Sequence, residues 1–119
     1  MNDKSKKLGQ IKNLIMLALA DGKATESELA LIASIASRES LSQDELDNLI
    51  DNPDSVKIDL PKDEEVKKRY LTDMVALMMI DGEMDDNEIA MCKIYAITLG
   101  YDSSVVENLV LSIADCLNK

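Results

Sequence analysis

Apolar residues recur along this chain at every third or fourth position, and polar residues fill most positions between them. This spacing places the apolar side chains on one face of a helix. No stretch alternates apolar and polar residues as a half-buried strand does, so the sequence predicts an all-α fold. Gly100 suits a C-terminal stop for the fifth helix. The predicted helices cover residues 5–20, about 25–38, 42–50, about 62–81, about 86–98 and 102–117.

The last three predicted helices repeat the first three in sequence. The octets at residues 21–28 and 81–88 share Asp, Gly and Glu at an offset of 60 residues. The repeats cover about 8–50 and 66–110, and two prolines mark the connector at about 51–62. We infer an internal duplication. Further identical pairs are Leu17/Leu77, Ala30/Ala90, Ala36/Ala96, Asn48/Asn108 and Leu49/Leu109.

A chain of 119 residues with 46% hydrophobic residues has the size of one domain with a substantial core. Each three-helix half has an apolar face that it cannot cover alone. We therefore expect residues 1–119 to form a single bundle of about six to seven helices, whose two halves are related by a pseudo-twofold axis. Aliphatic residues and Met must fill the core, because the chain has seven Met and no Phe or Trp.

The formal net charge of −10 repels phosphate backbones and anionic lipids, which argues against nucleic-acid and membrane-surface binding. No apolar run approaches the length that spans a membrane, and the N-terminus lacks an apolar signal segment. We therefore expect a cytoplasmic protein whose partners are other proteins. The lysines near the N-terminus are interpreted as a solubilising terminus. They are Lys4, Lys6, Lys7 and Lys12.

Histidine is absent, which removes the commonest general base and the commonest transition-metal ligand. The chain also has no phosphate-cradling loop and no arrangement typical of an activated nucleophile. Cys92 and Cys116 do not form a CxxC motif, and we expect both to be buried reduced thiols. The sequence therefore predicts that the protein is not an enzyme.

Both acidic octets have the composition of a tight turn between two helices. Gly22 and Gly82 stand where a helix ends in the left-handed conformation, which costs least for a residue without Cβ. The residue three positions after each Gly caps the next helix. The Glu three positions after that cap completes a capping box. The predicted pairs are Thr25/Glu28 and Asp85/Glu88. Helix capping thus explains most of the repeat.

Capping does not explain Asp21 and Asp81, which end helices where the dipole disfavours a negative side chain. Carboxylates beside free carbonyl oxygens are hard ligands of the kind that Ca²⁺ or Mg²⁺ prefers. The alternative is that both Asp side chains accept hydrogen bonds from the next helix. The loops are not EF-hands, because the twelfth residue from Asp81 is Cys92 rather than Glu. The candidate metal ligands are Asp21, Glu28, Asp81, Glu83, Asp85 and Glu88.

These features resemble the TerB-like family of tellurite-resistance proteins. The resemblance rests on Leu-Ala-Leu-Ala-Asp-Gly-Lys-Ala-Thr-Glu-Ser-Glu at 17–28, Leu-Met-Met-Ile-Asp-Gly-Glu-Met-Asp-Asp-Asn-Glu at 77–88 and Leu-Gly-Tyr-Asp at 99–102. It implies an all-helical bundle of two related halves and a bacterial cytoplasmic setting. Lys23 and Ile80 depart from the family pattern. The acidic residues that the resemblance implies as ligands of a divalent cation such as Ca²⁺ are Asp21, Glu28, Asp81 and Glu88.

The function that we predict is that of a non-enzymatic, acidic stress-response protein of the tellurite-resistance type. Its two Asp-Gly loops would bind a divalent cation, Ca²⁺ or Mg²⁺. The alternative is a protein-interaction module in which the same loops are only helix-capping turns. An exposed apolar patch would be the signature of that module. The Met-rich positions that could form such a patch are Met74, Met78, Met79 and Met91.

Overall fold

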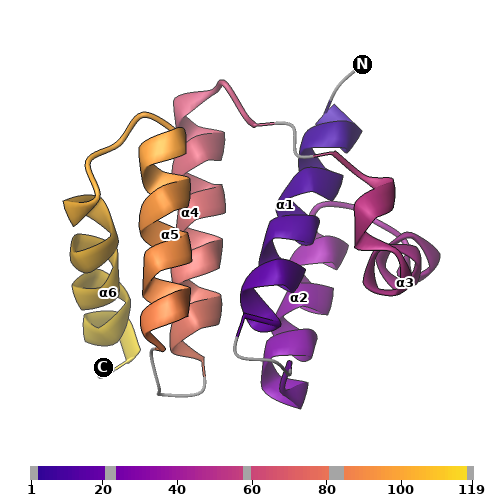
Figure 1. Ribbon diagram of the computed structural model, residues 1–119, viewed down its shortest axis with the longest axis horizontal. Coiled ribbons are helices and arrows are strands. Elements are labelled where there is room, and N and C mark those ends of the chain that lie inside the picture. Colours follow the sequence, from indigo (N-terminus) through magenta and orange to yellow (C-terminus); the bar gives the residue numbers. More distant parts are fainter. Residues whose placement is uncertain (1–2, 21–23, 58–59, 81–84, 118–119) are drawn as a thin grey trace.

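The computed structural model describes residues 3–20, 24–57, 60–80 and 85–117. Within these ranges the chain forms six α-helices, a short 3₁₀ helix and no strand, which confirms the all-α prediction. The helical bundle measures 34 × 31 × 26 Å (Figure 1). The elements are α1 (Asp3–Ala18), α2 (Glu26–Arg38), α3 (Gln43–Asp51), η1 (Pro53–Ser55), α4 (Glu64–Met79), α5 (Asp86–Thr98) and α6 (Ser104–Leu117).

Helices α1 and α4 lie side by side in the middle of the bundle (Figure 1). Apart from each other, α1 packs against α2 and α3, and α4 packs against α2, α5 and α6. On one side, α2 and α3 contact α1 and each other. On the other, α5 and α6 contact α4 and each other. The packing within one half is thus repeated in the other, as expected for a duplicated sequence. A pseudo-twofold relation between the halves stays a prediction.

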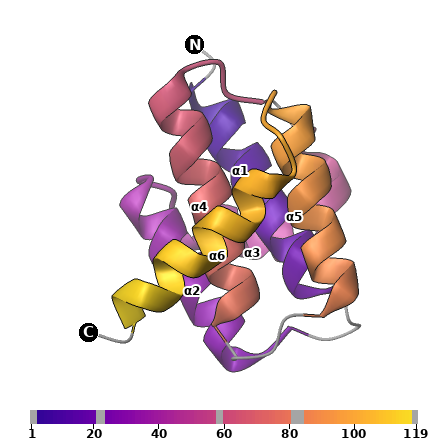
Figure 2. The ribbon, with the colours of Figure 1, turned by 90° about the vertical axis from the view of Figure 1, so that its left-hand side faces the viewer.

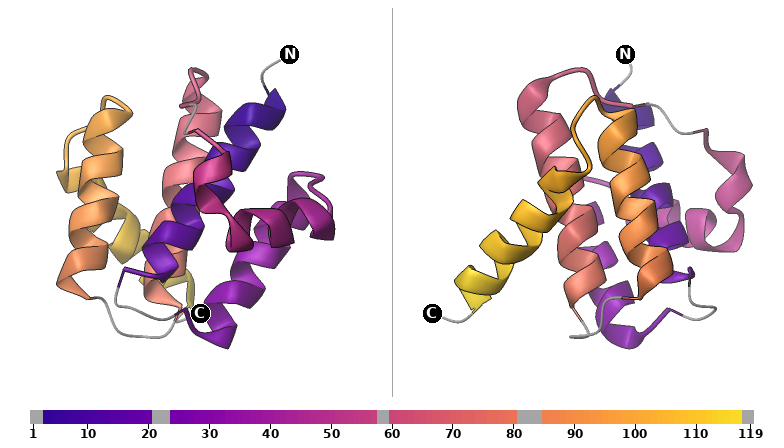
Figure 3. Two further views of the ribbon diagram at one scale, coloured as in Figure 1. Left: turned by 45° about the vertical axis from the view of Figure 1, so that its right-hand side comes forward. Right: turned by 60° about the vertical axis from the view of Figure 1, so that its left-hand side comes forward.

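The α6 helix crosses α4 obliquely, and its C-terminal part projects from the bundle (Figures 2 and 3). Its partner in the duplication, α3, is shorter and ends at Asp51. The projecting part of α6 therefore has no counterpart in the first half.

The core is aliphatic, as the composition requires. Leu14 and Leu17 of α1 and Leu77 of α4 are fully buried, and each contributes on the order of 1.5–3 kcal/mol by its removal from water. Met74 and Met78 are also core residues, with exposed fractions of 2% and 1%. The sequence favours a core position for most of the four Met-rich positions, and Met74 and Met78 confirm this. Met79 and Met91 are half-buried against the core, so these four methionines do not form an exposed patch. Met74 and Met78 face inward because α4 packs against helices on several sides.

Two of the helices end in the same manner. Ser40 follows α2 with φ 66°, and Gly100 follows α5 with φ 98°, so both residues are left-handed. In each place the next amide donates to a carbonyl oxygen five residues earlier, which is the hydrogen bond of a Schellman motif. These bonds run from Leu41 to Ala36 and from Tyr101 to Ala96, each 2.9 Å long.

Polar contacts between the halves are few and specific. The buried side chain of Gln10 donates from Nε2 to the carbonyl oxygen of Tyr70 and accepts from the Tyr95 hydroxyl, at 2.9 and 3.1 Å. Arg38 at the end of α2 forms two hydrogen bonds with the carboxylate of Asp73 on α4, of 3.2 and 2.7 Å. These contacts fix the axial positions of α1, α2 and α5 relative to α4.

Candidate functional site

The helices that flank the two acidic octets have their adjoining ends at one end of the bundle. α1 ends and α2 begins beside the first octet, and α4 ends and α5 begins beside the second (Figures 1 and 2). The fold therefore brings four helix termini, two from each repeat, to the same end of the molecule. A cation that takes ligands from both loops requires this arrangement.

The Thr25/Glu28 capping box that the sequence predicts is present. The Glu28 amide donates to Thr25 Oγ1 at 3.1 Å, and the Thr25 amide donates to Glu28 Oε1 at 2.9 Å. The Glu28 side chain is 3% exposed, so its carboxylate is held against the protein. One carboxylate oxygen of this candidate ligand therefore already serves the helix terminus.

The second loop differs from the first at its cap. Asp85 is the N-cap of α5, as predicted, but its Oδ1 accepts from the amide of Asn87 at 2.7 Å. The predicted Asp85/Glu88 capping box is wrong in this respect, because the Asp85 side chain accepts from the amide two residues ahead rather than three. Glu88 is buried, with an exposed fraction of 5%. The two loops thus use their carboxylates differently.

The remaining candidate residues Asp21, Gly22, Asp81, Gly82 and Glu83 lie outside the described residues. Their predicted roles stay predictions. In residues 3–20, 24–57, 60–80 and 85–117, no group of three or more Asp, Glu, Cys or His side chains is placed to hold a metal ion.

The two cysteines have opposite environments. Cys92 on α5 is fully buried, and burial, together with the charge of Glu88, raises the pKa of its thiol to about 12. This thiol stays protonated at neutral pH, which makes it a poor nucleophile and a poor metal ligand. Cys116 is exposed near the end of α6, so the expectation of two buried thiols is wrong for this residue. It lies on the projecting part of α6, which is less covered than the rest of the bundle.

An apolar hollow of about 380 Å³ opens between α4, α5 and α6. An ion pair of 3.2 Å between Lys93 and Glu107 joins α5 to α6 beside it. The apolar spacing does not predict this hollow, because most of its residues match the core pattern of their helices. Its apolar lining consists of Met78, Ile89, Val106, Val110 and Leu111.

The most exposed large apolar side chains lie on α5 and α6. Leu111 of α6 is 69% exposed, and Ile94 and Ile97 of α5 are 64% and 58% exposed. Ile94 and Ile97 are three residues apart and so share one helix face. The three most exposed of these side chains therefore lie on α5 and α6. Less exposed ones lie elsewhere, at Met16, Leu19, Leu29, Ile50 and Ile80.

No helix within the described part of the chain combines the length and the apolar character needed to cross a membrane. Comparison with the models of known protein families, with curated proteins and with solved structures finds no match to this chain.

Proposed function

We propose that this protein is a non-enzymatic, acidic stress-response protein of the TerB-like type that works in the bacterial cytoplasm. In this proposal the two acidic octets, residues 21–28 and 81–88, bind a divalent cation, Ca²⁺ or Mg²⁺. The apolar hollow between α4, α5 and α6 binds a protein partner. The observation that supports this proposal is the position of the hollow against the last turn of α4 and the first turn of α5, the helix ends that flank the second octet.

Two residues connect the hollow with these helix ends. Met78 lines the hollow within the last turn of α4, and Ile89 lines it within the first turn of α5. The sequence between α4 and α5 leads into residues 81–88, which contain five carboxylates and no base. Like charges at this density repel one another, and a bound cation relieves that repulsion. Cation binding would therefore change the spacing of α4 and α5 and with it the width of the hollow.

The second candidate function is an interaction module in which the loops only cap helices. The Thr25/Glu28 box favours it for the first loop, because both members of that box are already used for capping. Leu111, Ile94 and Ile97 would form the partner surface in either case. The two functions differ in whether partner binding depends on a cation.

Thermal unfolding after exhaustive EDTA treatment tests the cation. We expect Ca²⁺ or Mg²⁺ to raise the Tm at fixed ionic strength, by roughly 5 °C when the ion is at tenfold its Kd. The variant with Asp81→Asn and Glu88→Gln should lose this rise. A matched control removes two charges elsewhere, at the exposed residues Asp51 and Glu65, by Asp51→Asn and Glu65→Gln.

The control variant should respond to the cation as the wild type does. An equal rise with monovalent salt of the same ionic strength would contradict the cation site. The methyl resonance of Met78 reports separately on the hollow, and it should shift with the cation in the wild type and the control variant but not in the variant with Asp81→Asn and Glu88→Gln. If a chelator does not change partner binding, the result would favour the second candidate function, the interaction module.

A further inference from the structure

A second hollow lies at the opposite end of the α1/α4 pair, between the first turns of α1 and the beginning of α4. Its volume is about 370 Å³, which is within the range of small-molecule sites. Lysine and arginine side chains dominate its charge, in a chain whose net charge is −10. The four bases in its lining are Lys6, Lys7, Lys62 and Arg69, and the one acid is Asp63.

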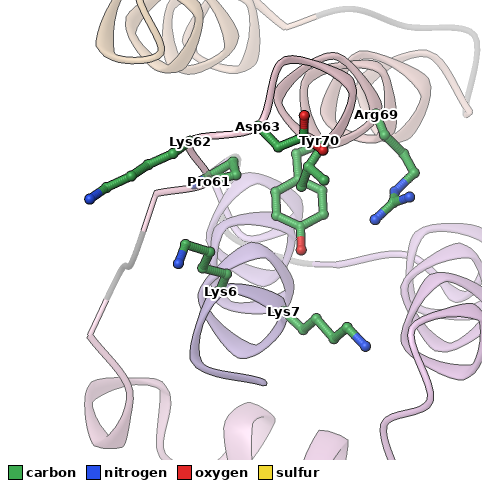
Figure 4. A pocket seen from close by; sticks show the side chains of 8 residues that line it. Lys6, Lys7, Pro61, Lys62, Asp63, Arg69 and Tyr70 are labelled. Carbon is green, nitrogen blue, oxygen red and sulfur yellow. The ribbon is translucent and has the colours of Figure 1, made fainter. Parts of the chain in front are cut away.

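The close view shows how these side chains are arranged (Figure 4). The ring of Tyr70 lies in the middle, with Lys6 and Lys62 extending to one side of it and Lys7 and Arg69 to the other. The Arg69 guanidinium carbon is 5.7 Å from the centre of the Tyr70 ring. Two segments far apart in sequence therefore contribute positive charge to one concave surface.

Three of these bases have no acidic partner within the described part of the chain. Other lysines form ion pairs, for example Lys4 with Glu45 at 2.6 Å, but none pairs Lys6, Lys7 or Lys62. Lys6 and Lys7 are nevertheless only half exposed. Unpaired ammonium groups around one hollow raise its positive potential, and an anion bound in the hollow lowers that cost.

Arg69 also keeps hydrogen-bonding capacity for a ligand. Its contacts with the buried carboxylate of Glu39 are long, with Nε to Oε2 at 3.4 Å and the second nitrogen to Oε1 at 3.5 Å. A guanidinium has five N–H donors, and a planar fork of donors matches phosphate oxygens. Burial, the main cause, raises the pKa of Tyr70, so its hydroxyl stays a neutral donor at physiological pH.

From this arrangement we propose that the hollow binds a small phosphate monoester, whose phosphate accepts hydrogen bonds from Arg69 and from lysine side chains of the lining that turn toward it. A phosphate dianion offers several acceptor oxygens to ammonium and guanidinium donors. The Asp63 carboxylate in the lining can accept a hydrogen bond from a hydroxyl group of the organic part. The hollow lies at the opposite end of α1 and α4 from the helix ends that flank the two acidic octets.

The surroundings of the hollow favour a small ligand over a polyanion. Glu64 and Glu65 follow Asp63 directly on the first turn of α4, and both are exposed. A nucleic acid or an anionic bilayer would extend past the hollow onto these carboxylates and would meet the negative charge of the whole chain. A small phosphate ester contacts the basic residues without this repulsion.

NMR titration with inorganic phosphate and with glycerol 3-phosphate, at ionic strength held constant with chloride, tests the proposal. We expect saturable amide shifts confined to the residues around the hollow. The variant with Lys6→Gln and Lys62→Gln should bind glycerol 3-phosphate at least about tenfold more weakly. The control with Lys57→Gln and Lys68→Gln removes the same charge from exposed positions and should change affinity less than about twofold.

Other results would overturn the proposal. Shifts that rise linearly without saturation, or that chloride reproduces, would show only ionic-strength effects. Equal weakening in both lysine variants would show that the hollow has no special role. Sedimentation with phosphatidylcholine vesicles containing phosphatidylserine provides a second arm. Lys6-dependent binding to these vesicles without binding of either soluble phosphate would replace the small ligand with a lipid surface.

Discussion

The Nε2 atom of Gln10 donates a hydrogen bond of 2.9 Å to the main-chain carbonyl oxygen of Tyr70. These two residues are 60 positions apart, so they occupy equivalent places in the two repeats. The equivalent places are thus in contact with each other, but they hold different side chains. The same Gln10 side chain also accepts a hydrogen bond from the Tyr95 hydroxyl, at 3.1 Å. The Gln10 side chain therefore joins the two halves, whereas Tyr70 contributes its main-chain carbonyl oxygen to the contact.

Replacing Gln10 by Leu should destabilise the fold by roughly 2–3 kcal/mol, because it leaves the buried Tyr95 hydroxyl without this acceptor. Tyr95→Phe removes the hydroxyl itself and should cost only about 1 kcal/mol. Urea unfolding at pH 7 measures both. A Gln10→Leu variant as stable as the wild type would contradict the importance of this contact.

Arg38→Met should destabilise the protein by about 2 kcal/mol at pH 7, because it leaves Asp73 without its cation. The value is at the low end for a broken buried pair, since Arg38 is 45% exposed and water screens it. Burial already raises the pKa of Asp73, although Arg38 partly offsets this effect. Without Arg38 the pKa of Asp73 rises further.

The pH dependence of this variant follows from the sign of that change. A carboxyl group whose pKa is higher in the folded state favours folding when protonated, and the cost of its charge grows as the pH rises through the folded pKa. The destabilisation by Arg38→Met should therefore shrink as the pH falls from 7 to about 4. Urea unfolding at both pH values measures this. The same shrinkage in a variant that also has Asp73→Asn would show that another group is responsible.

Separate substitutions at the two left-handed residues test whether the backbone conformation at these helix ends affects stability. Ser40→Gly should stabilise the protein by roughly 0.5–1 kcal/mol, because a left-handed backbone disfavours a residue with Cβ. Gly100→Ala should destabilise it by about 1 kcal/mol for the same reason, although open space surrounds the added Cβ. Thermal unfolding of the two variants should give shifts of opposite sign, and shifts of the same sign would refute the explanation.

The exposed pair of Lys4 and Glu45 makes a pH-dependent contact between α1 and α3. The Lys4 ammonium, at 2.6 Å, and the Ser42 amide lower the pKa of Glu45 to about 2. A carboxyl group with a lowered folded pKa contributes stability above its usual pKa of 4.5, and this is lost as the pH falls toward about 2. NMR titration of the Glu45 side chain should show the low midpoint, and Lys4→Gln should raise it. An unchanged midpoint would assign the shift to Ser42 alone.

Thiol accessibility gives a further check on the packing of α5. One thiol, that of Cys116, should react with a thiol reagent at pH 8 in the folded protein, because Cys92 is buried and its pKa is raised to about 12. Both should react in denaturant. Rapid reaction of two thiols in the native state would contradict the burial of Cys92, and the Cys116→Ser variant separates the two signals.

The helices could be predicted from the sequence because their signals are local. Apolar spacing placed every helix within a few residues, and Gly100 marked the end of α5. Ser40 marks the same place after α2, but a serine in the left-handed conformation has no clear sequence signal. The repeat gives a clearer indication that α2 ends near Ser40, because Ser40 aligns with Gly100 at the offset of 60.

The surface features could not be predicted in this way, because they depend on how helices cross. Lys6 and Lys62 are 56 positions apart in sequence, and only the packing of α1 against α4 brings them to one hollow. The interpretation of Lys6 and Lys7 as a solubilising terminus left out Lys62 and Arg69. By contrast, Leu111 is out of register with Val106, Val110 and Ile113 on the apolar face of α6, and it is 69% exposed.

The separation of charge along α1 and α4 gives the molecule an electric dipole moment. Lys6, Lys7 and Lys62 lie near the beginnings of these helices, whereas Asp85 and Asp86 lie at the other end. A charged partner exerts a torque on such a molecule before any contact forms, out to about the Debye length of 8 Å in physiological salt. An approaching anion would meet the basic end first despite the negative net charge. Orientation during encounter, and therefore the association rate, would fall as salt is added.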